Sequence, residues 1–184
     1  MDRDVFIISA ITAAEPDEAI RQALENIGSK PSRVQDAVFG SNGLTSIPEV
    51  EDFAKKAGLP CSTVVVSSSL RAIFFAAQSI LSGDLDIAVV IGLGEKASTA
   101  FMLASHDAVG RYNLLPRARL ASRSLAGTDS ALHNAGLVSG DVAVFKAGES
   151  GSLAVKELLE ELEQRQAHWG MLSTGDLALL VERI

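Results

Sequence analysis

Residues 63–81, TVVVSSSLRAIFFAAQSIL, contain the two elements that decide the fold. The β-branched start, residues 63–66, predicts a strand, and the residues from about 68 to 81 predict a helix that Gly83 stops. Apolar side chains go nearly all the way round this helix, so we expect it to be buried on every side. A single sheet covered by helices cannot bury a helix in this way, and we therefore expect an additional layer of structure.

Strands and helices alternate around this segment. Apolar runs and helical periodicity predict strands at residues 5–10, 34–40 and 87–91, and helices at residues 17–27 and from Ser46 onward. Ser46, with Glu49 three residues later, is a capping-box signature. This alternation is typical of an α/β sheet with right-handed crossovers.

The second part of the chain contains short sequence similarities to the first. Strands are expected at residues 117–125, 142–146, 171–173 and 177–182, and helices at 130–135 and 153–166. The tripeptide Ala-Val-Phe occurs at residues 37–39 and 143–145, and Ser-Leu at 69–70 and 152–153. These short repeats leave both an internal duplication and chance open; a duplication would mean that the second part has lost a helix–strand unit. Residues 99–116 have no clear periodicity, and we expect a linker there.

The composition argues against several classes of function. With a net charge of −7 and a pI of about 4.9, the chain offers no basic patch for a nucleic-acid or membrane-surface partner. The one cysteine, Cys61, rules out an internal disulfide and a multi-cysteine metal site; a structural thiol in a reducing compartment is expected. The apolar runs are too short for a signal peptide or a membrane span, so the cytoplasm is the expected location.

Three segments of the first half resemble motifs of the thiolase superfamily. Residues 5–12, VFIISAIT, resemble its opening strand, roughly V-I-V-S-A-x-R-T. Residues 64–72, VVVSSSLRA, resemble its nucleophile segment V-N-x-x-C-[AS]-S-G-[LM]-[QK]-A, and residues 92–98, GLGEKAS, resemble G-G-x-E-x-M-S. Weaker similarities in the second half lie at residues 135–137, 141–144, 158–162 and 177–183.

The resemblance implies an α/β fold layered αβαβα, built from two pseudo-duplicated halves with two buried central helices. On this basis we expect an N-terminal thiolase-like half at residues 1–104, a linker at 105–116 and a reduced C-terminal half at 117–184, packed as one compact unit. The large loop domain that carries most of the family's coenzyme A contacts is expected to be absent, since so few residues separate the halves.

The residues that carry thiolase chemistry depart from the family's pattern. A thiolase needs a cysteine thiolate at the N-terminus of its first central helix, where the helix dipole and backbone N–H groups activate it. Val66 occupies that position here. The Asn-His-Glu-Ala-Phe-type motif keeps at most Glu149, the Gly-His-Pro motif has no counterpart, and Thr174-Gly175-Asp176 stands where the Cys-Gly-Gly turn should lie. We therefore expect no thiolase chemistry.

The retained residues favour a non-catalytic thiolase-like protein that dimerises. Thiolases dimerise across the strand that resembles residues 63–66, which implies an interface at Thr63, Val64, Val65 and Val66, with Glu95 as a structural residue near it. The expected partner is a second copy, or an intact thiolase or ketosynthase-type protein.

Two alternatives stay open. Ser67 or Ser68 could serve as the nucleophile of an acyl-CoA acyltransferase if a base lay beside it, although the simpler expectation is that these serines cap the helix. Glu149 is more simply a helix-start carboxylate than a catalytic remnant. The protein could also hold a coenzyme A thioester without turnover; no other cofactor and no metal is expected. The histidines of the chain, His106, His133 and His168, belong to no recognised motif.

Overall fold

The computed structural model describes the chain except residues 1–3, 27, 29, 42–44, 61 and 148–150. In chain order the elements are β1 (Val5–Ala13), α1 (Pro16–Asn26), η1 (Pro31–Arg33), β2 (Asp36–Ser41), α2 (Ile47–Lys56), β3 (Ser62–Val66), α3 (Ser69–Ser82), β4 (Ile87–Leu93), β5 (Ser98–Ser105), α4 (His106–Tyr112), β6 (Ala118–Ser124), α5 (Thr128–Ala135), η2 (Ser139–Asp141), β7 (Val144–Ala147), α6 (Gly151–Gln164), β8 (Trp169–Thr174) and β9 (Leu177–Arg183). Within the described residues the strands form one sheet, in which neighbouring strands are hydrogen-bonded in the order β3-β2-β4-β5-β1-β6-β9-β8-β7.

The two halves have the same strand arrangement. In the first, β2 runs parallel to β4, β4 antiparallel to β5, and β5 antiparallel to β1. In the second, β7 runs parallel to β8, β8 antiparallel to β9, and β9 antiparallel to β6. Even the register irregularities agree, one between Ile7 and Ser9 in β1 and one between Leu120 and Ser122 in β6. The internal duplication that the sequence left open is therefore present in the fold.

The second half lacks a counterpart of α2 and β3. In the first half these two elements lie between β2 and α3, whereas only residues 148–150 separate β7 from α6. The predicted loss of a helix–strand unit, and with it the reduced second half, is confirmed. No large loop domain lies between the halves, because β5 is followed only by α4 and a short connection before β6 begins.

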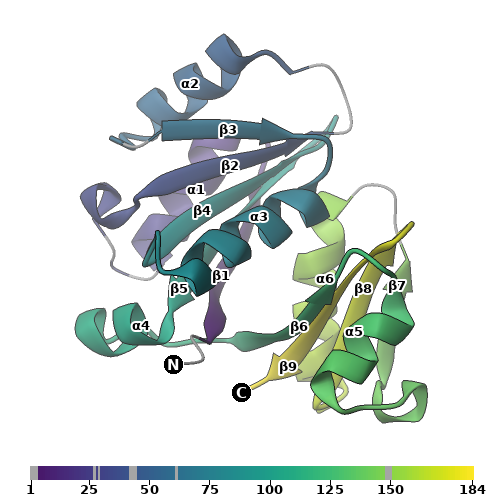
Figure 1. Cartoon of the computed structure of the whole chain (residues 1–184). Helices are drawn as coiled ribbons and strands as arrows, with labels where there is room; N and C mark the ends of the chain where they lie inside the picture. Colours follow the sequence, from purple (N-terminus) through teal and green to yellow (C-terminus); the bar gives the residue numbers. More distant parts are fainter. Residues whose placement is uncertain (1–3, 27, 29, 42–44, 61, 148–150) are drawn as a thin grey trace.

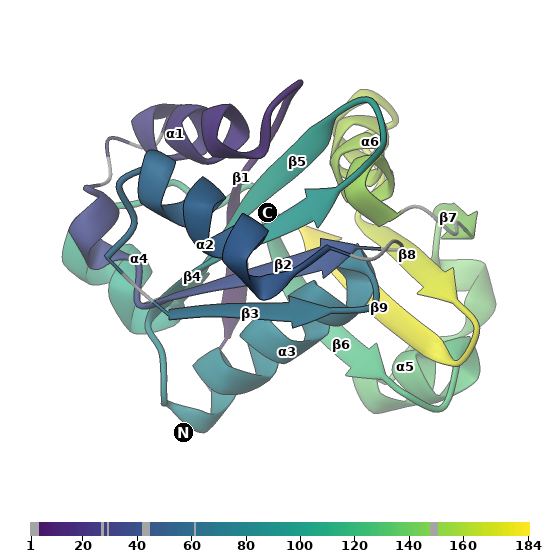
Figure 2. The same ribbon diagram turned by 90° about the horizontal axis from the view of Figure 1, so that it is seen from above.

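Helices α3 and α6 form the middle layer of the molecule (Figures 1 and 2). Ile73 of α3 and Leu158 of α6 belong to one buried cluster, which both half-sheets line. Alternate strand residues face opposite ways, so Val90 of β4 packs into this cluster while its neighbour Val89 packs beneath α1 and α2. In β9, Leu180 packs instead against the outer helix α5. The order of layers is the predicted αβαβα.

The prediction of a linker from residue 99 was wrong. Strand β5, Ser98–Ser105, is buried along its whole length between β4 and β1. A strand covered on both faces carries no alternation of polar and apolar residues, and this one is built mainly from small and apolar side chains. The connection at residues 105–116 contains helix α4, which Ser105 caps by accepting a hydrogen bond from the Ala108 N–H at 3.1 Å.

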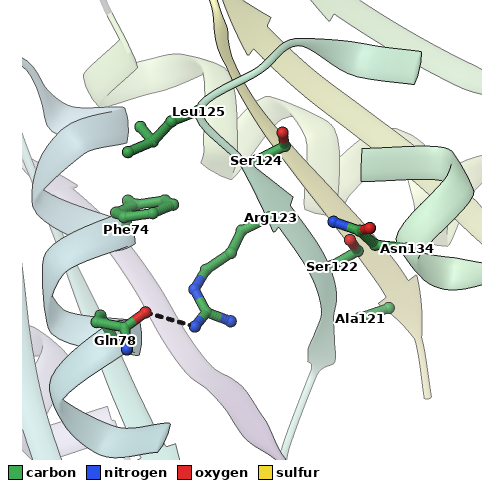
Figure 3. Close-up of a pocket in the computed structure, with 8 residues that line it drawn as sticks. All are labelled: Phe74, Gln78, Ala121, Ser122, Arg123, Ser124, Leu125 and Asn134. Carbon is green, nitrogen blue, oxygen red and sulfur yellow. Dashed lines mark hydrogen bonds between the residues drawn. The ribbon is translucent and has the colours of Figure 1, made fainter. Parts of the chain in front are cut away.

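The prediction that α3 is buried on every side was also wrong on one side. Ala72, Ile73 and Ala76 are buried, but Phe75 is 51% exposed and Gln78 is exposed as well. Gln78 faces β6 across a cavity instead of a packed layer (Figure 3), and Phe75 lies outside the lining of that cavity. Within the described residues, no helix is long and apolar enough to cross a membrane.

An ion-pair network reinforces the short connection between the half-sheets. β1 and β6 pair only at Phe6 with Arg119 and at Ile7 with Ala118. Next to this connection, the Arg119 guanidinium contacts Glu182 at 2.6 Å and Asp4 at 3.0 Å. Arg119 therefore links the start of the first half to the last strand of the second.

Replacing Arg119 by Met should lower the free energy of unfolding by about 1 to 2 kcal/mol, because two charge-assisted hydrogen bonds are lost and Glu182 keeps a partly buried carboxylate. Arg21→Met is the matched control, since the exposed Arg21–Asp17 pair on α1 should contribute less than about 0.5 kcal/mol. Urea unfolding of both variants checks the difference. Equal losses would show that the Arg119 network does not stabilise the connection.

Candidate functional site

A cavity of about 680 Å³ lies between the start of α3 and the turn that joins β8 to β9. These two segments belong to different halves of the chain, and the central layer brings them together. The residues that line the cavity are Ser67, Ser68, Arg71, Leu125, Thr174, Gly175, Asp176 and Leu177. The cavity thus contains the residues that follow Val66 and the turn that stands in place of Cys-Gly-Gly.

The N-terminus of α3 presents serine hydroxyls to this cavity. Ser68 is the N-cap, and its Oγ accepts a hydrogen bond from the Arg71 N–H at 3.3 Å, which confirms the capping expected of the serines. Ser67 is exposed and Ser69 is buried beneath it. The first N–H groups of a helix carry partial positive charge, so this end of the cavity favours a polar or anionic group.

Close packing of β2 against the start of α3 fixes the position of the serines. A Cβ built on Gly40 would lie 2.5 Å from the carbonyl carbon and oxygen of Ser68 and from the Cα of Ser69. Gly40 is also the residue that pairs with Val66 on one side and with Gly92 on the other. Only glycine lets the backbone that enters α3 pass this close to the sheet.

The opposite wall of the cavity is the tight turn between β8 and β9. This turn is formed by Thr174-Gly175-Asp176, the residues expected in place of the Cys-Gly-Gly turn. Gly175 adopts a φ of 54°, which favours glycine, and the Asp176 carbonyl accepts a hydrogen bond from the Gly127 N–H at 2.6 Å. Thr174 and Asp176 add a hydroxyl and a carboxylate to the cavity. The Arg71 guanidinium has no ion-pair partner among the described residues.

No histidine lines this cavity. His106 and His168 line a separate cavity, and the Nε2 of His168 lies 3.0 Å from Glu182. His133 lies on α5. Cys61 and Glu149 fall outside the described residues, and the described residues contain no cluster of three metal-ligating side chains. The cavity can therefore bind polar groups through hydroxyls and one guanidinium, but it holds no imidazole to activate a serine.

Strand β3 is the outermost strand of the sheet in the described chain. Val66 ends it and packs, half-buried, against the central core. Val64 is 43% exposed, and Thr63 and Val65 are half-buried. Glu95 lies exposed in the β4–β5 connection, at the same end of the sheet as Val66 but not beside β3.

Sequence reasoning gave no role to Arg71 or Leu125. Arg71 does carry a signal, since it is the one charged residue in a helix that is otherwise apolar, small or neutral. Leu125 carries no such signal, because its place beside α3 depends on how the two halves pack.

Gly40→Ala should destabilise the fold by about 1 to 3 kcal/mol, because the added methyl overlaps the backbone of Ser68 and forces the start of α3 to move. Amide shifts at Ser67, Ser68 and Arg71 should report the movement by NMR. Gly110→Ala is the control: nothing lies within 4 Å of its Cβ, and alanine in helix α4 should be neutral or stabilising. A Gly40→Ala protein with wild-type stability and shifts would refute this account.

Comparisons with known proteins agree with this architecture. The chain is 33% identical over 103 residues to acetyl-CoA acetyltransferase IA of Candida tropicalis, covering 51% of this chain and 26% of that protein. It is 39% identical over 82 residues to acetyl-CoA acetyltransferase of Chromobacterium violaceum, covering 40% and 21%. The matched part is thus about a quarter of the length of these curated relatives. No protein-family model matches the chain.

Similarity to solved structures extends over nearly the whole chain. The structure of human mitochondrial 3-ketoacyl-CoA thiolase in complex with CoA matches with a TM-score of 0.88 and 12% identity, covering 99% of this chain and 98% of that chain. A second structure of the human thiolase matches with a TM-score of 0.87 and 12% identity, covering 98% and 99%. At this identity the match establishes the fold.

Proposed function

The chain has the thiolase fold and partial sequence similarity to curated acetyl-CoA acetyltransferases, and from this premise we propose that it is a non-catalytic subunit of the thiolase superfamily that pairs through the edge strand β3. The exposed, unprotected edge of β3 is the observation that carries the proposal. A cytoplasmic location and the absence of a dedicated cofactor belong to the same proposal. They are supported by the single cysteine and the acidic composition.

Val66 supports the non-catalytic part of the proposal. Nucleophilic acyl transfer at the start of α3 needs a thiolate or an activated hydroxyl, and a valine side chain supplies neither. The β8–β9 turn likewise offers Thr174 and Asp176 where a second thiol would be needed to move a proton. An aliphatic side chain cannot replace a titratable thiol, so the position of Val66 serves packing: it lies against the central core.

Strand β3 lacks the features that normally keep an edge strand from pairing. Edge strands are commonly protected by lysine, proline, inward charges or a bulge. β3 reads Ser-Thr-Val-Val-Val, pairs with β2 without a register shift, and carries no charge. Val64 is exposed on it. Addition of another β3 strand would extend the sheet and cover this side chain, as in an isologous dimer. An intact thiolase-type chain is the other partner that fits this edge.

Val64→Lys should convert the dimer to a monomer, because a lysine on β3 would place two ammonium groups close together across a symmetric interface. Val138→Lys is the matched control. Val138 is a 67% exposed valine that precedes η2 in the second half of the chain, and it does not belong to the edge strand. Light scattering after size-exclusion chromatography gives the mass of each variant.

The pure wild-type protein should have the mass of two chains, and Val138→Lys should keep it. A wild-type monomer that forms a complex with a purified intact thiolase would favour the heteromeric arrangement, provided that Val64→Lys abolishes the complex. A monomer that binds neither itself nor such a thiolase would rule out the pairing proposal.

The serines at the cavity support a second candidate, an acyl-CoA acyltransferase that uses Ser67 or Ser68. Both hydroxyls line the 680 Å³ cavity together with Arg71 and Thr174. The Ser68 hydroxyl is engaged as a helix cap, no histidine lines the cavity, and neither serine forms a hydrogen bond with the Asp176 carboxylate among the described residues. We therefore rank this function below the non-catalytic subunit.

Incubation with acetyl-CoA separates the two functions. We expect no mass increase of the intact protein and no release of free coenzyme A, because neither serine is activated. An acetyl adduct that disappears in Ser67→Ala or Ser68→Ala would favour the acyltransferase.

Melting curves with coenzyme A test binding without turnover. A ligand that is present at 100 times its Kd and binds only the folded state raises the free energy of unfolding by about 2.7 kcal/mol.

A further inference from the structure

A second cavity of about 550 Å³ lies beside the first, between α3 and β6 (Figure 3). Leu125 lines both cavities, so they form neighbouring compartments along one side of α3. The residues that line the second cavity are Phe74, Gln78, Ala121, Ser122, Arg123, Ser124, Leu125 and Asn134. None of them is catalytic in the function proposed above, and none is acidic.

Arg123 reaches from β6 across this cavity toward α3. Its Nη2 donates a hydrogen bond to the Gln78 Oε1 at 2.6 Å, and its guanidinium carbon lies 5.7 Å from the centre of the Phe74 ring (Figure 3). The other terminal nitrogen points away from Gln78 (Figure 3). The Nε atom is buried and has no hydrogen-bond partner. Among the described residues, no carboxylate forms an ion pair with this guanidinium.

This unpaired cation is costly in the free protein. Burial lowers the pKa of Arg123, which means that its charged form has lost hydration. A partly buried charge is normally compensated by an opposite charge, as Arg117 is by Glu163 and Arg119 by Glu182. In a chain with a net charge of −7, a carboxylate partner would be easy to supply, yet Arg123 faces only a neutral amide and an aromatic ring.

The remaining walls indicate what kind of anion fits. Phe74 and Leu125 form an apolar wall on the α3 side of an otherwise mostly polar cavity, and Asn134 lies on the other side of β6 beside Ser122 (Figure 3). A planar guanidinium matches the geometry of a carboxylate. We propose that the cavity between α3 and β6 binds the carboxylate of a small amphipathic organic anion at Arg123, with its apolar part against Phe74 and Leu125. This inference does not depend on the proposed pairing through β3.

Hexanoate is a suitable probe, with hexanamide as its uncharged counterpart and inorganic phosphate as an anion without an apolar part. The Nε–H signal of Arg123 in a nitrogen-15 correlation spectrum reports binding directly. Hexanoate should shift this signal saturably, and hexanamide and phosphate should bind at least about tenfold more weakly, because each lacks one of the two matching features.

Arg123→Gln should weaken hexanoate binding, followed by calorimetry or ligand-observed NMR, by about tenfold or more. Arg21→Gln is the matched control, since Arg21 is an exposed arginine on α1 that lines neither cavity; it should change the affinity less than about twofold. Gln78→Glu is a second variant at an exposed position that preserves shape. Its carboxylate should pair with Arg123 in place of the Gln78 amide and reduce hexanoate binding even if Arg123→Gln fails to fold.

Three outcomes would overturn the inference. Hexanoate could leave the Arg123 Nε–H signal unchanged. It could bind Arg123→Gln or Gln78→Glu as well as the wild type. Phosphate or hexanamide could bind as tightly as hexanoate, in which case either the apolar wall or the charge plays no part in recognition.

Discussion

The packing of α3 against α6 between two half-sheets is the constraint on which the rest of the structure depends. Each helix buries side chains against strands of both halves, so neither half has a complete core without the other. Each Leu or Ile that is fully buried there stabilises the fold by about 1.5 to 3 kcal/mol. The direct strand pairing between the halves is much weaker support, since it involves only two residue pairs and the Arg119 ion pairs beside them.

The position of α3 also decides what the molecule can bind. Its N-terminus meets the β8–β9 turn in one cavity, and its exposed side faces Arg123 in the next. Gly40 holds the first of these in place by letting Ser68 approach β2. The loss of a helix–strand unit from the second half leaves the layers intact, because the missing pair corresponds to α2 and β3 at the outer edge of the first half. The same arrangement leaves β3 as an edge strand available to a partner.

Sequence reasoning succeeded where residues close together in the chain form the structural feature. Ser46 and Glu49 do form a capping box, with the Glu49 carboxylate 2.7 Å from the Ser46 N–H, and this hydrogen bond lowers the Glu49 pKa. Sequence reasoning failed at β5, because a strand buried on both faces has no alternation to detect. It also overestimated the burial of Phe75, since the apolar character of a helix does not reveal which neighbour is missing.

The sequence by itself determined the alternation of strands and helices, the need for a middle layer, and the absence of a thiol at Val66. These follow from residue identity and local periodicity, and no arrangement in space can give a valine a nucleophilic atom. Only the tertiary structure decided that Ser67 and Thr174 line one cavity and that Arg123 lies over the Phe74 ring. These arrangements depend on how the two halves of the chain pack around the shared helix layer. The free energy that stabilises this packing comes from the whole buried core, so no local sequence pattern reveals it.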